Sequence, residues 1–467
     1  MANLTFWGAA DQVTGSCYLL ETARARVLLE CGLVQGRFED EERNRDPFPF
    51  PVEALNAVVL SHAHLDHSGR LPRLVRAGYR GRIWLTHATG EIVEVILKDA
   101  AHLSARDAEW ENRRRHRAGR QEIEALYSVD DVEATLKYCE GVNYGKRVTI
   151  ADGVDLCFHD AGHILGSAIV ELFIRENGVE RRLVFSGDLG NSDAALLRDP
   201  AMVTDADLLL LESTYGDRDH QPMNRTLEEF ESALIAADKN KGNVLIPSFA
   251  IGRTQELIFR LGELYQAGRL PQRAVFLDSP MAIAATEIYH RFQNVFNSSD
   301  TAELRRAHAG SLHRFLPILR YSHTAEDSIA LNRIQEGAII IAGSGMCTGG
   351  RILHHLKHNL WRRGTDIIIV GYQAVGTLGR ALVDGAKQVR ILGEEIAVAA
   401  RVHTLGGFSA HAGQSQLLGW AGQFREPRPR LCLVHGESEK MRALQHAFAE
   451  RLDWRAETHA IGDKIEF

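Results

Sequence analysis

The residues best suited to chemistry lie together in one short segment, Ser61–His67, with the sequence SHAHLDH. It places three imidazoles and one carboxylate within six residues, directly after the apolar run Ala57–Leu60, so the side chains can converge on a metal ion without the backbone folding over itself. Histidine and aspartate are good ligands for zinc, and two metal ions can share such a cluster. The alternative is a polar loop that happens to be rich in histidine, but so dense a pattern favours a metal site.

Three further candidate ligands stand just beyond short apolar runs. They are His163 after Asp155–Phe158, Asp188 after Leu183–Phe185, and His435 after Leu431–Val434. Each alone is more often a cap or a turn residue. With His62, His64, Asp66 and His67 they make seven ligands, enough for two metal ions about 3.5–4 Å apart with positions left open for water and substrate. Two such ions lower the pKa of a bridging water toward ~7, so the chemistry indicated is hydrolysis.

The composition indicates the class of protein that carries this site. The chain has 467 residues, of which 45% are hydrophobic and 25% charged, which is typical of a globular protein with two to four domains. It excludes a collagen-like, disordered or disulfide-scaffold class. With 54 Lys and Arg against 61 Asp and Glu, the net charge of −7 does not by itself indicate a nucleic-acid binder. The chain also contains 21 histidines.

The compartment is predicted from what the sequence lacks. No apolar run is long enough for a transmembrane helix, and the first residues show no secretory signal. The six cysteines form no C-x-x-C pair and several lie in or beside apolar stretches, so buried free thiols are expected. A cytoplasmic location follows as an expectation.

The sequence shows two patterns of predicted secondary structure, and the first must position the ligands. Up to about residue 212, short apolar runs bounded by Gly, Asp and His predict buried strands, interrupted by a charged helical excursion between Glu91 and Tyr138. Examples of these runs are Arg26–Leu29, Ala57–Leu60, Arg82–Leu85, Asp155–Phe158, Ile169–Ile174, Leu183–Phe185 and Leu208–Leu211. The last 65 residues return to short strands, of which Arg430–Val434 is the clearest.

The middle of the chain, from about residue 213 to 402, alternates helices with strands. The predicted helices are Thr226–Lys239, Thr254–Ala267 and Ile352–Asn359, and the predicted strands are Asn243–Ile246, Ala274–Leu277, Ala338–Ala342 and Asp366–Val370. This alternation predicts a parallel sheet with helices on both faces. Because no linker separates the parts, we expect one α/β unit inserted into another.

The candidate ligands resemble those of the metallo-β-lactamase superfamily. Three further stretches are similar to motifs A, B and C of its β-CASP branch, the nucleic-acid-processing nucleases: Glu212–Gly216, Phe408–His411 and Val434–Glu437. Within that branch the chain resembles bacterial and archaeal RNA-degrading enzymes and the cleavage-and-polyadenylation endonuclease subunit. The resemblance runs nearly end to end, from Gly8–Ala10 and Val13–Ser16 to motif C.

The resemblance implies an α/β fold. A metallo-β-lactamase αββα sandwich, residues 1–212 and 403–467, is interrupted by an inserted β-CASP α/β domain with a mainly parallel sheet, residues 213–402. It also implies two Zn²⁺ ions per chain: His62, His64 and His163 would hold one, Asp66, His67 and His435 the other, and Asp188 would bridge them.

Further roles follow from the same resemblance. His411 would act as general acid on the departing oxygen, and Glu212 would orient it and keep it protonated, since a carboxylate beside an imidazole raises the imidazole pKa. Asp66 and Asp188 count among the catalytic groups. The family usually has Asp where this chain has Glu30, so the longer carboxylate must be repositioned or its supporting role altered.

Phosphate contacts are expected at two strand-to-helix junctions. Gly343–Arg351 follows a predicted strand and precedes a helix; its small residues would let backbone N–H groups approach a phosphate, although a tight turn is an equal alternative. The candidate RNA-phosphate ligands are Arg253, Ser344, Gly345, Thr348, Gly349, Gly350, Arg351 and Ser409. The basic run Arg113–Arg117 is more typical of a solvated helix face.

The function predicted is a zinc-dependent ribonuclease. A dizinc-bound hydroxide would hydrolyse RNA phosphodiester bonds in the cleft between the two domains, with His411 as general acid. RNA is preferred over DNA because motif C carries His435, where DNA-processing members typically have Val. The alternatives are a small-molecule thioester or lactam hydrolase of the same superfamily and a non-catalytic RNA-binding member. RNA is the expected partner, no membrane is involved, and a homodimer is compatible; the sequence decides neither endonuclease nor exonuclease activity.

Overall fold

The computed structural model describes residues 2–36, 38–307 and 310–467. The chain divides into two compact units, and each is described by itself. Unit 1 comprises Met1–Ser192, Asp199–Asp219 and His411–Phe467, and unit 2 comprises Asp193–Arg198 and His220–Ala410. One α/β unit is thus inserted into another, as the sequence predicts. The domain boundaries at 212/213 and 402/403 stay a prediction.

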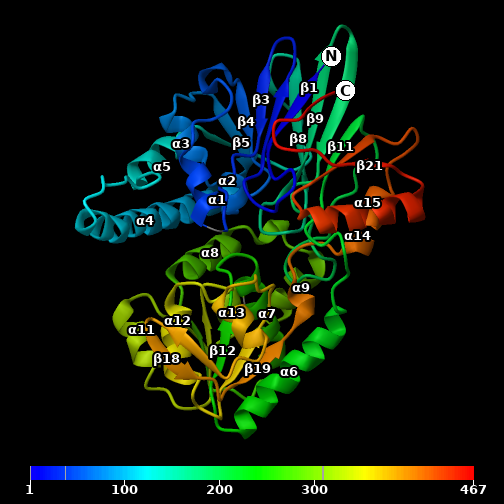
Figure 1. The fold of residues 1–467 in the computed structure, drawn as a ribbon. Coiled ribbons are helices and arrows are strands. Elements are labelled where there is room, and N and C mark those ends of the chain that lie inside the picture. Colours follow the sequence, from blue (N-terminus) through cyan, green and yellow to red (C-terminus); the bar gives the residue numbers. More distant parts are fainter. Residues whose placement is uncertain (1, 37, 308–309) are drawn as a thin grey trace. The chain divides into compact units, whose positions relative to one another are not determined.

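Unit 1 is built on two seven-stranded sheets (Figure 1). The first has the order β22 (Lys464–Glu466), β1 (Asn3–Gly8), β2 (Cys17–Glu21), β3 (Arg26–Leu29), β4 (Ala57–Val59), β5 (Arg82–Thr86) and β6 (Cys139–Val142). The second has the order β21 (Ala456–Glu457), β20 (Arg430–Val434), β11 (Leu208–Glu212), β10 (Val179–Phe185), β9 (Ala168–Glu176), β8 (Val154–Asp160) and β7 (Val148–Ala151). β1 pairs with β22 and β11 with β20, so the last part of the chain completes both sheets.

The core of unit 1 lies between the two sheets, because alternate side chains of each strand point inward. Tyr18 from the first sheet is fully buried, with its ring centroid 6.0 Å from Phe6 and 5.4 Å from Phe185 of the second sheet. The other face of the second sheet packs Leu209 and Leu211 into a separate buried cluster that includes residues of two C-terminal helices. These helices complete the second half of the predicted αββα sandwich.

The helices of unit 1 cap and cover the sheets. They are α1 (Phe38–Glu42), α2 (Leu65–Ser68), α3 (Leu71–Arg76), α4 (His87–Arg117), α5 (Val129–Leu136), α14 (Gln414–Ala421) and α15 (Ser438–Leu452), with 3₁₀ turns at Arg43–Arg45 and Val52–Ala54. The predicted excursion is therefore two helices, α4 and α5, and residues 118–128 between them are not helical. A capping box of Ser128 and Asp131 starts α5. None of the helices in the described ranges has the length and apolarity that a membrane crossing requires.

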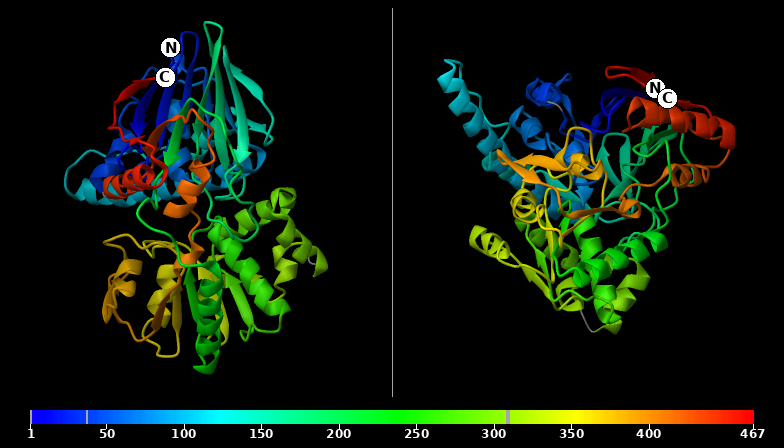
Figure 2. Two further views of the ribbon diagram at one scale, coloured as in Figure 1. Left: turned by 90° about the vertical axis from the view of Figure 1, so that its right-hand side faces the viewer. Right: turned by 60° about the horizontal axis from the view of Figure 1, so that its bottom comes forward.

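Unit 2 is centred on a six-stranded sheet in which every pairing is parallel. Its order is β14 (Leu319–Tyr321), β13 (Ala274–Leu277), β15 (Ala338–Ala342), β12 (Val244–Pro247), β16 (Asp366–Ile369) and β19 (Arg401–Thr404). All residues of β12, β15 and β16 are buried, which requires cover on both faces. The predicted parallel sheet with helices on both faces is confirmed (Figure 2).

The remaining elements of unit 2 surround this sheet. They are α6 (Met223–Lys239), α7 (Arg253–Gln266), α8 (Pro280–Arg291), α9 (Ser298–Arg306), α10 (Leu312–Phe315), α11 (Ala325–Leu331), α12 (Arg351–Asn359) and α13 (Leu378–Val383), the hairpin β17 (Gln388–Ile391) and β18 (Glu394–Ala397), and 3₁₀ turns at Gln293–Val295 and Gly406–Phe408. The predicted helices and strands of this part agree with the observed bounds to within three residues at each end.

Candidate functional site

Seven predicted ligands meet at strand ends of unit 1. His62 and His64 lie in the loop after β4, and Asp66 and His67 lie in the short helix α2 that follows. The other three, His163, Asp188 and His435, follow β8, β10 and β20 of the second sheet. Ends of strands from both sheets therefore supply the cluster.

The first group of ligand atoms contains three imidazole nitrogens and one carboxylate oxygen. His64 Nδ1 lies 3.1 Å from His62 Nε2 and 3.2 Å from His163 Nε2. Asp188 Oδ2 lies 3.5 Å from both His62 Nε2 and His163 Nε2. Four ligand atoms from three segments of the chain thus face one another at separations of 3.1–3.5 Å.

The second group lies on the other side of the same carboxylate. Asp188 Oδ1 is 3.4 Å from His67 Nε2 and 3.6 Å from His435 Nε2. Asp66 Oδ2 is 3.9 Å from His67 Nε2 and 3.8 Å from His435 Nε2. Asp188 therefore turns one oxygen toward each group, which is the arrangement of a bridging ligand.

The donor set fits zinc. At Zn–N distances of 2.0–2.1 Å the edge of a ligand tetrahedron is about 3.3 Å, close to the 3.1–3.6 Å separations within the first group and around Asp188. His67 Nε2 and Asp188 Oδ1 are also buried without a hydrogen bond to any residue in the described ranges. Buried polar atoms are almost always partnered, so these two atoms indicate a ligand such as a metal ion.

Glu30 holds one of these ligands in place. The residue is fully buried with φ 63°, and its carboxylate accepts hydrogen bonds from the backbone N–H of Ser61 at 2.6 Å and the hydroxyl of Ser61 at 2.9 Å. His67 Nδ1 lies 2.5 Å from the same carboxylate, which leaves Nε2 directed at Asp188. The longer side chain thus reaches the ligand that a supporting carboxylate would orient.

Sequence reasoning missed three serines that support the ligands. Ser61 Oγ lies 3.0 Å from His62 Nδ1, and Ser16 Oγ lies 3.0 Å from His435 Nδ1. Ser167 Oγ accepts a hydrogen bond from the backbone N–H of His163 at 3.0 Å. Ser61 is adjacent to a ligand in the sequence, but only the folded sheets bring Ser16 to His435, 419 residues away.

The predicted acid and its partner lie beside the ligand cluster. His411 Nδ1 is 3.4 Å from Glu212 Oε1 and 3.8 Å from Asp188 Oδ2. Glu212 is fully buried at the end of β11, where its carboxylate accepts a hydrogen bond from the backbone N–H of Leu189 at 2.7 Å. Leu189 O in turn accepts from the backbone of Ala412 at 2.8 Å. One carboxylate therefore ties the Asp188 turn to the His411 segment.

Burial and charge set the protonation of these groups. Burial, together with the neighbouring His67, holds the pKa of His62 well below its usual range, and burial also lowers the pKa of His64, so both favour the neutral form that binds metal. Burial would raise the pKa of Asp188, but the imidazoles of His435 and His67 outweigh it and hold that pKa far below its usual value. Asp188 is therefore ionised.

Two further groups are shifted upward. Burial would lower the pKa of His67, but Asp188 and Asp66 outweigh it and raise that pKa well above its ordinary value. Burial likewise opposes protonation of His411, yet the Glu212 carboxylate, with Asp188 and Asp66, raises the pKa of His411 to about 8. An imidazole with that pKa carries a proton at neutral pH, as a general acid must.

The predicted phosphate ligands lie in unit 2, mostly where its parallel strands end. The loop after β15 is closed by Ser344, whose Oγ accepts hydrogen bonds from the backbone N–H groups of Thr348 at 3.0 Å and Gly349 at 3.2 Å and lies 3.1 Å from Thr348 Oγ1. Gly345 is buried in this loop, Gly350 precedes α12, and Ser409 follows the 3₁₀ turn Gly406–Phe408.

The two predicted arginines bind protein groups. Arg351 Nη1 donates to the buried carboxylate of Asp278 at 2.7 Å and to Ser322 O at 3.0 Å. Arg253 is only 8% exposed, and its Nη1 donates to Val370 O at 2.9 Å. Both guanidinium groups therefore fasten the loops at this edge, and their contact with a phosphate stays a prediction.

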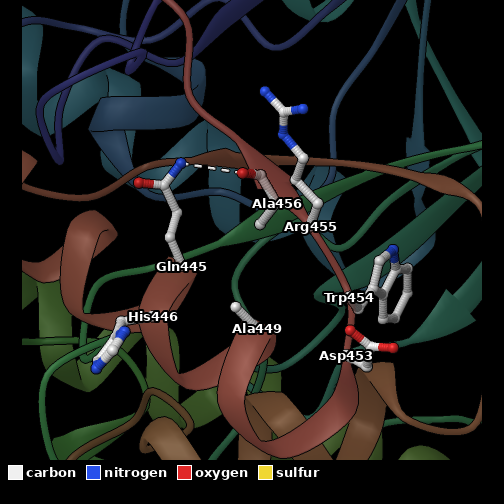
Figure 3. A pocket seen from close by; sticks show the side chains of 7 residues that line it. All are labelled: Gln445, His446, Ala449, Asp453, Trp454, Arg455 and Ala456. Atoms are coloured by element: carbon white, nitrogen blue, oxygen red, sulfur yellow. Dashed lines mark hydrogen bonds between the residues drawn. The ribbon is translucent and has the colours of Figure 1, made fainter.

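A surface hollow of about 420 Å³ in unit 1 contains none of these residues. Figure 3 shows it between α15 and the strand β21, with Gln445 Nε2 donating to Ala456 O at 3.0 Å. Its lining residues are Gln445, His446, Ala449, Asp453, Trp454, Arg455 and Ala456. It carries no candidate ligand, and the ligand cluster remains the site.

Two sheets enclosing a cluster of histidine and aspartate at their ends, with a second α/β unit inserted, define a class of metal-dependent hydrolases. Three family descriptions match consecutive parts of the chain: a beta-lactamase superfamily domain over residues 25–247, a Beta-Casp domain over 254–382, and a Zn-dependent metallo-hydrolase RNA specificity domain over 395–458.

Relatives match nearly the whole chain. It is 42% identical to Ribonuclease TTHA0252 of Thermus thermophilus over 95% of both chains, and 31% identical to Transcription termination factor FttA of Methanocaldococcus jannaschii over 94% of this chain and 67% of that one. A solved structure of a protein of unknown function from Enterococcus faecalis shares the fold, with a TM-score of 0.57 at 13% identity and 99% of both chains covered. The chain belongs to the β-CASP family of the metallo-β-lactamase superfamily.

Proposed function

We propose that this protein is a zinc-dependent ribonuclease that hydrolyses phosphodiester bonds of RNA with two zinc ions per chain. The observation that carries the proposal is the carboxylate of Asp188, which turns one oxygen toward each of two ligand groups. The name of the 42% identical relative and the RNA specificity domain support RNA as the substrate. The choice of RNA rather than DNA as the substrate rests also on His435 in motif C.

In this proposal, His62, His64 and His163 would hold one ion, Asp66, His67 and His435 would hold the other, and Asp188 would serve both. When bound, the ions supply a water nucleophile of lowered pKa and positive charge that offsets the charge developing on the phosphoryl oxygens. All seven ligands are present, which favours an enzyme over a non-catalytic RNA-binding protein.

The protein's own groups complete the reaction. Glu212 orients the His411 imidazole through Nδ1, at 3.4 Å from its carboxylate. His411 donates its proton to the oxygen that leaves phosphorus, and Glu212 stabilises the imidazolium before transfer. Glu30 and Ser61 keep the ligand imidazoles oriented while this happens.

At the carboxyl edge of unit 2 we propose phosphate contacts from Ser344, Gly345, Thr348, Gly349, Gly350 and Ser409, with Arg253 and Arg351 fastening that edge. Hydroxyl and backbone N–H groups are donors of the kind that bind phosphate oxygens, and a phosphate would replace Ser344 Oγ as the acceptor for the N–H groups of Thr348 and Gly349. A homodimer and a cytoplasmic location stay predictions.

The test is cleavage by purified, zinc-loaded protein of an end-labelled RNA and a DNA of the same sequence, with thioester and lactam substrates in parallel. We expect RNA cleavage, two zinc ions per chain, and little cleavage of DNA. DNA cleaved as fast as RNA would contradict the substrate assignment, and hydrolysis of only the small substrates would contradict the nuclease. A circular form of the same RNA separates endonuclease from exonuclease activity.

A further inference from the structure

Three loops of unit 2 meet at one edge of its sheet. The strands β12, β15 and β16 are adjacent and parallel, so residues 248–252, 343–350 and 370–377 all follow strand ends at the same edge. In open α/β sheets this is the edge at which ligands bind.

An aromatic side chain stands exposed there. Phe249, in the first loop, is 47% exposed. Its ring lies against Gly345 of the second loop, where an added Cβ would come within 2.8 Å of Cδ2 and Cε2 of the ring. Only glycine therefore allows the ring to rest on this backbone, and about half of the residue stays exposed to solvent.

Hydrogen bonds hold the backbone that carries the ring. Phe249 O accepts hydrogen bonds from the hydroxyls of Thr254 at 2.7 Å and Ser248 at 3.1 Å. The glycine beneath the ring is held as well, because the buried Gln373 donates from Nε2 to Gly345 O at 3.0 Å and to Gly371 O at 3.1 Å. A preorganised surface loses little conformational freedom when a ligand binds.

The loops at this edge carry both apolar and hydroxyl groups. In the third loop, a Cβ added to Gly371 would lie 4.0 Å from Phe249 Cε2, and the next residue, Tyr372, is 43% exposed. Next to Gly345, the hydroxyls of Ser344 and Thr348 lie 3.1 Å apart. A flat apolar ring beside small hydroxyl and glycine residues matches a nucleotide, whose base is flat and whose sugar and phosphate accept hydrogen bonds.

We infer that Phe249, with Tyr372 on the adjoining loop, forms a stacking site for the bases of single-stranded RNA at this edge of unit 2. The inference rests on the proposed function for its choice of ligand. No base-edge contact is required of Phe249, so the site accepts any base, and it contributes binding rather than chemistry.

The test compares Phe249→Leu, which removes the ring, with Phe249→Trp, which keeps one. Trp361→Leu is the matched control, because Trp361 is 56% exposed in the same unit but follows α12, at the other end of the neighbouring strands. Each protein is titrated with a single-stranded RNA, and with RNAs in which one nucleotide at a time lacks its base; thermal melting checks folding.

We expect Phe249→Leu to weaken RNA binding and raise KM roughly tenfold, within the range for loss of one stacked base, with kcat nearly unchanged. Phe249→Trp and Trp361→Leu should bind as the wild type does. At one position of the RNA, loss of the base should weaken wild-type binding by a similar factor and leave Phe249→Leu unaffected.

Equal binding by wild type and Phe249→Leu overturns the inference, as does a defect of the same size on every base-less RNA. A change of oligomeric state in Phe249→Leu in place of weaker RNA binding also overturns it, since the patch would then be a protein contact. If the binding pattern holds but the zinc-loaded protein does not cleave RNA, the proposed function fails and the stacking site stands.

Discussion

The ligand cluster of unit 1 and the loop edge of unit 2 are built in opposite ways. In the cluster, function depends on side chains that are buried and held by other side chains, as Glu30 holds His67. At the loop edge, the closest approach is made by a glycine, Gly345, and the charged groups, Arg351 among them, are turned inward to fasten the fold. A site that binds metal ions needs charged side chains in fixed positions. A site that binds an extended RNA strand needs accessible backbone groups and flat side chains.

The largest expected effect tests whether Asp188 serves both ligand groups. Asp188→Ala should reduce RNA cleavage to background and lower the zinc content of both positions, because each group loses an oxygen. Dialysis of the wild type against a chelator should likewise remove zinc and abolish RNA cleavage, and added zinc should restore the cleavage. Zinc content by mass spectrometry and cleavage by gel are the measurements.

Asp152→Ala is the control, since this carboxylate is 65% exposed and pairs only with the exposed Arg24 among the contacts described. A variant at Asp188 that keeps two zinc ions per chain would show that the two groups do not share this residue.

The next effect separates chemistry from metal binding. His411→Ala should lower kcat for RNA by ~10²–10⁴-fold, the usual contribution of a general acid, with zinc content unchanged. His446→Ala, at an exposed position on α15, should leave the rate at the wild-type value. An undiminished rate in His411→Ala would remove His411 from the role of acid.

A smaller effect is expected from Glu30, which contacts a ligand but is not one itself. Glu30→Gln keeps the size of the side chain but replaces with an amide the carboxylate that contacts His67 and Ser61. Zinc affinity or activity should fall about 10–100-fold, as is usual for groups that orient metal ligands. Competition with a calibrated chelator measures it. Unchanged affinity would mean that packing alone orients His67.

The smallest effect on catalysis is expected from the buried charges of unit 2, which should act on stability. Burial opposes ionisation of Asp278, but hydrogen bonds from His355, Ser328 and Arg351 hold its pKa below the ordinary 3.8. The carboxylate therefore stabilises the fold at pH above about 4, and this contribution is lost as the pH falls through the lowered value.

Asp278→Asn should lower the free energy of unfolding at neutral pH by about 3 kcal/mol, because it leaves Arg351 without its anion. The melting temperature should fall accordingly. The deficit should shrink toward pH 3 in scans from pH 7 downward. A deficit that is the same at every pH would show that charge is not its source.

The sequence revealed the ligand cluster better than the loop edge. Four ligands fall within His62–His67, and a motif that local can be read without knowing the fold. The second sheet also carried Asp188 and His435 at the ends of clear apolar runs. Ser16 could not be found, because serine is common and only the pairing of distant strands brings it to His435.

The loop edge was harder because its partners are distant and ordinary. Arg351 is a candidate phosphate ligand by type and position, and nothing local shows that Asp278, 73 residues earlier, binds it. Phe249 reads as one more apolar residue, since exposure is a property of the folded surface. The strands β14 and β19 were also missed, because brief runs at the two edges of the sheet in unit 2 carry little periodicity.

The insertion of unit 2 has a consequence for synthesis on the ribosome. Chains grow from the N-terminus, and His411 and His435 stand 349 and 373 residues after His62. Until they emerge, a growing chain holds most of the ligands but lacks one of them and the acid, and β11 has no β20 beside it. Under the proposed roles of His411 and His435, a nascent chain does not cleave the messenger RNA that encodes it until both residues have been added.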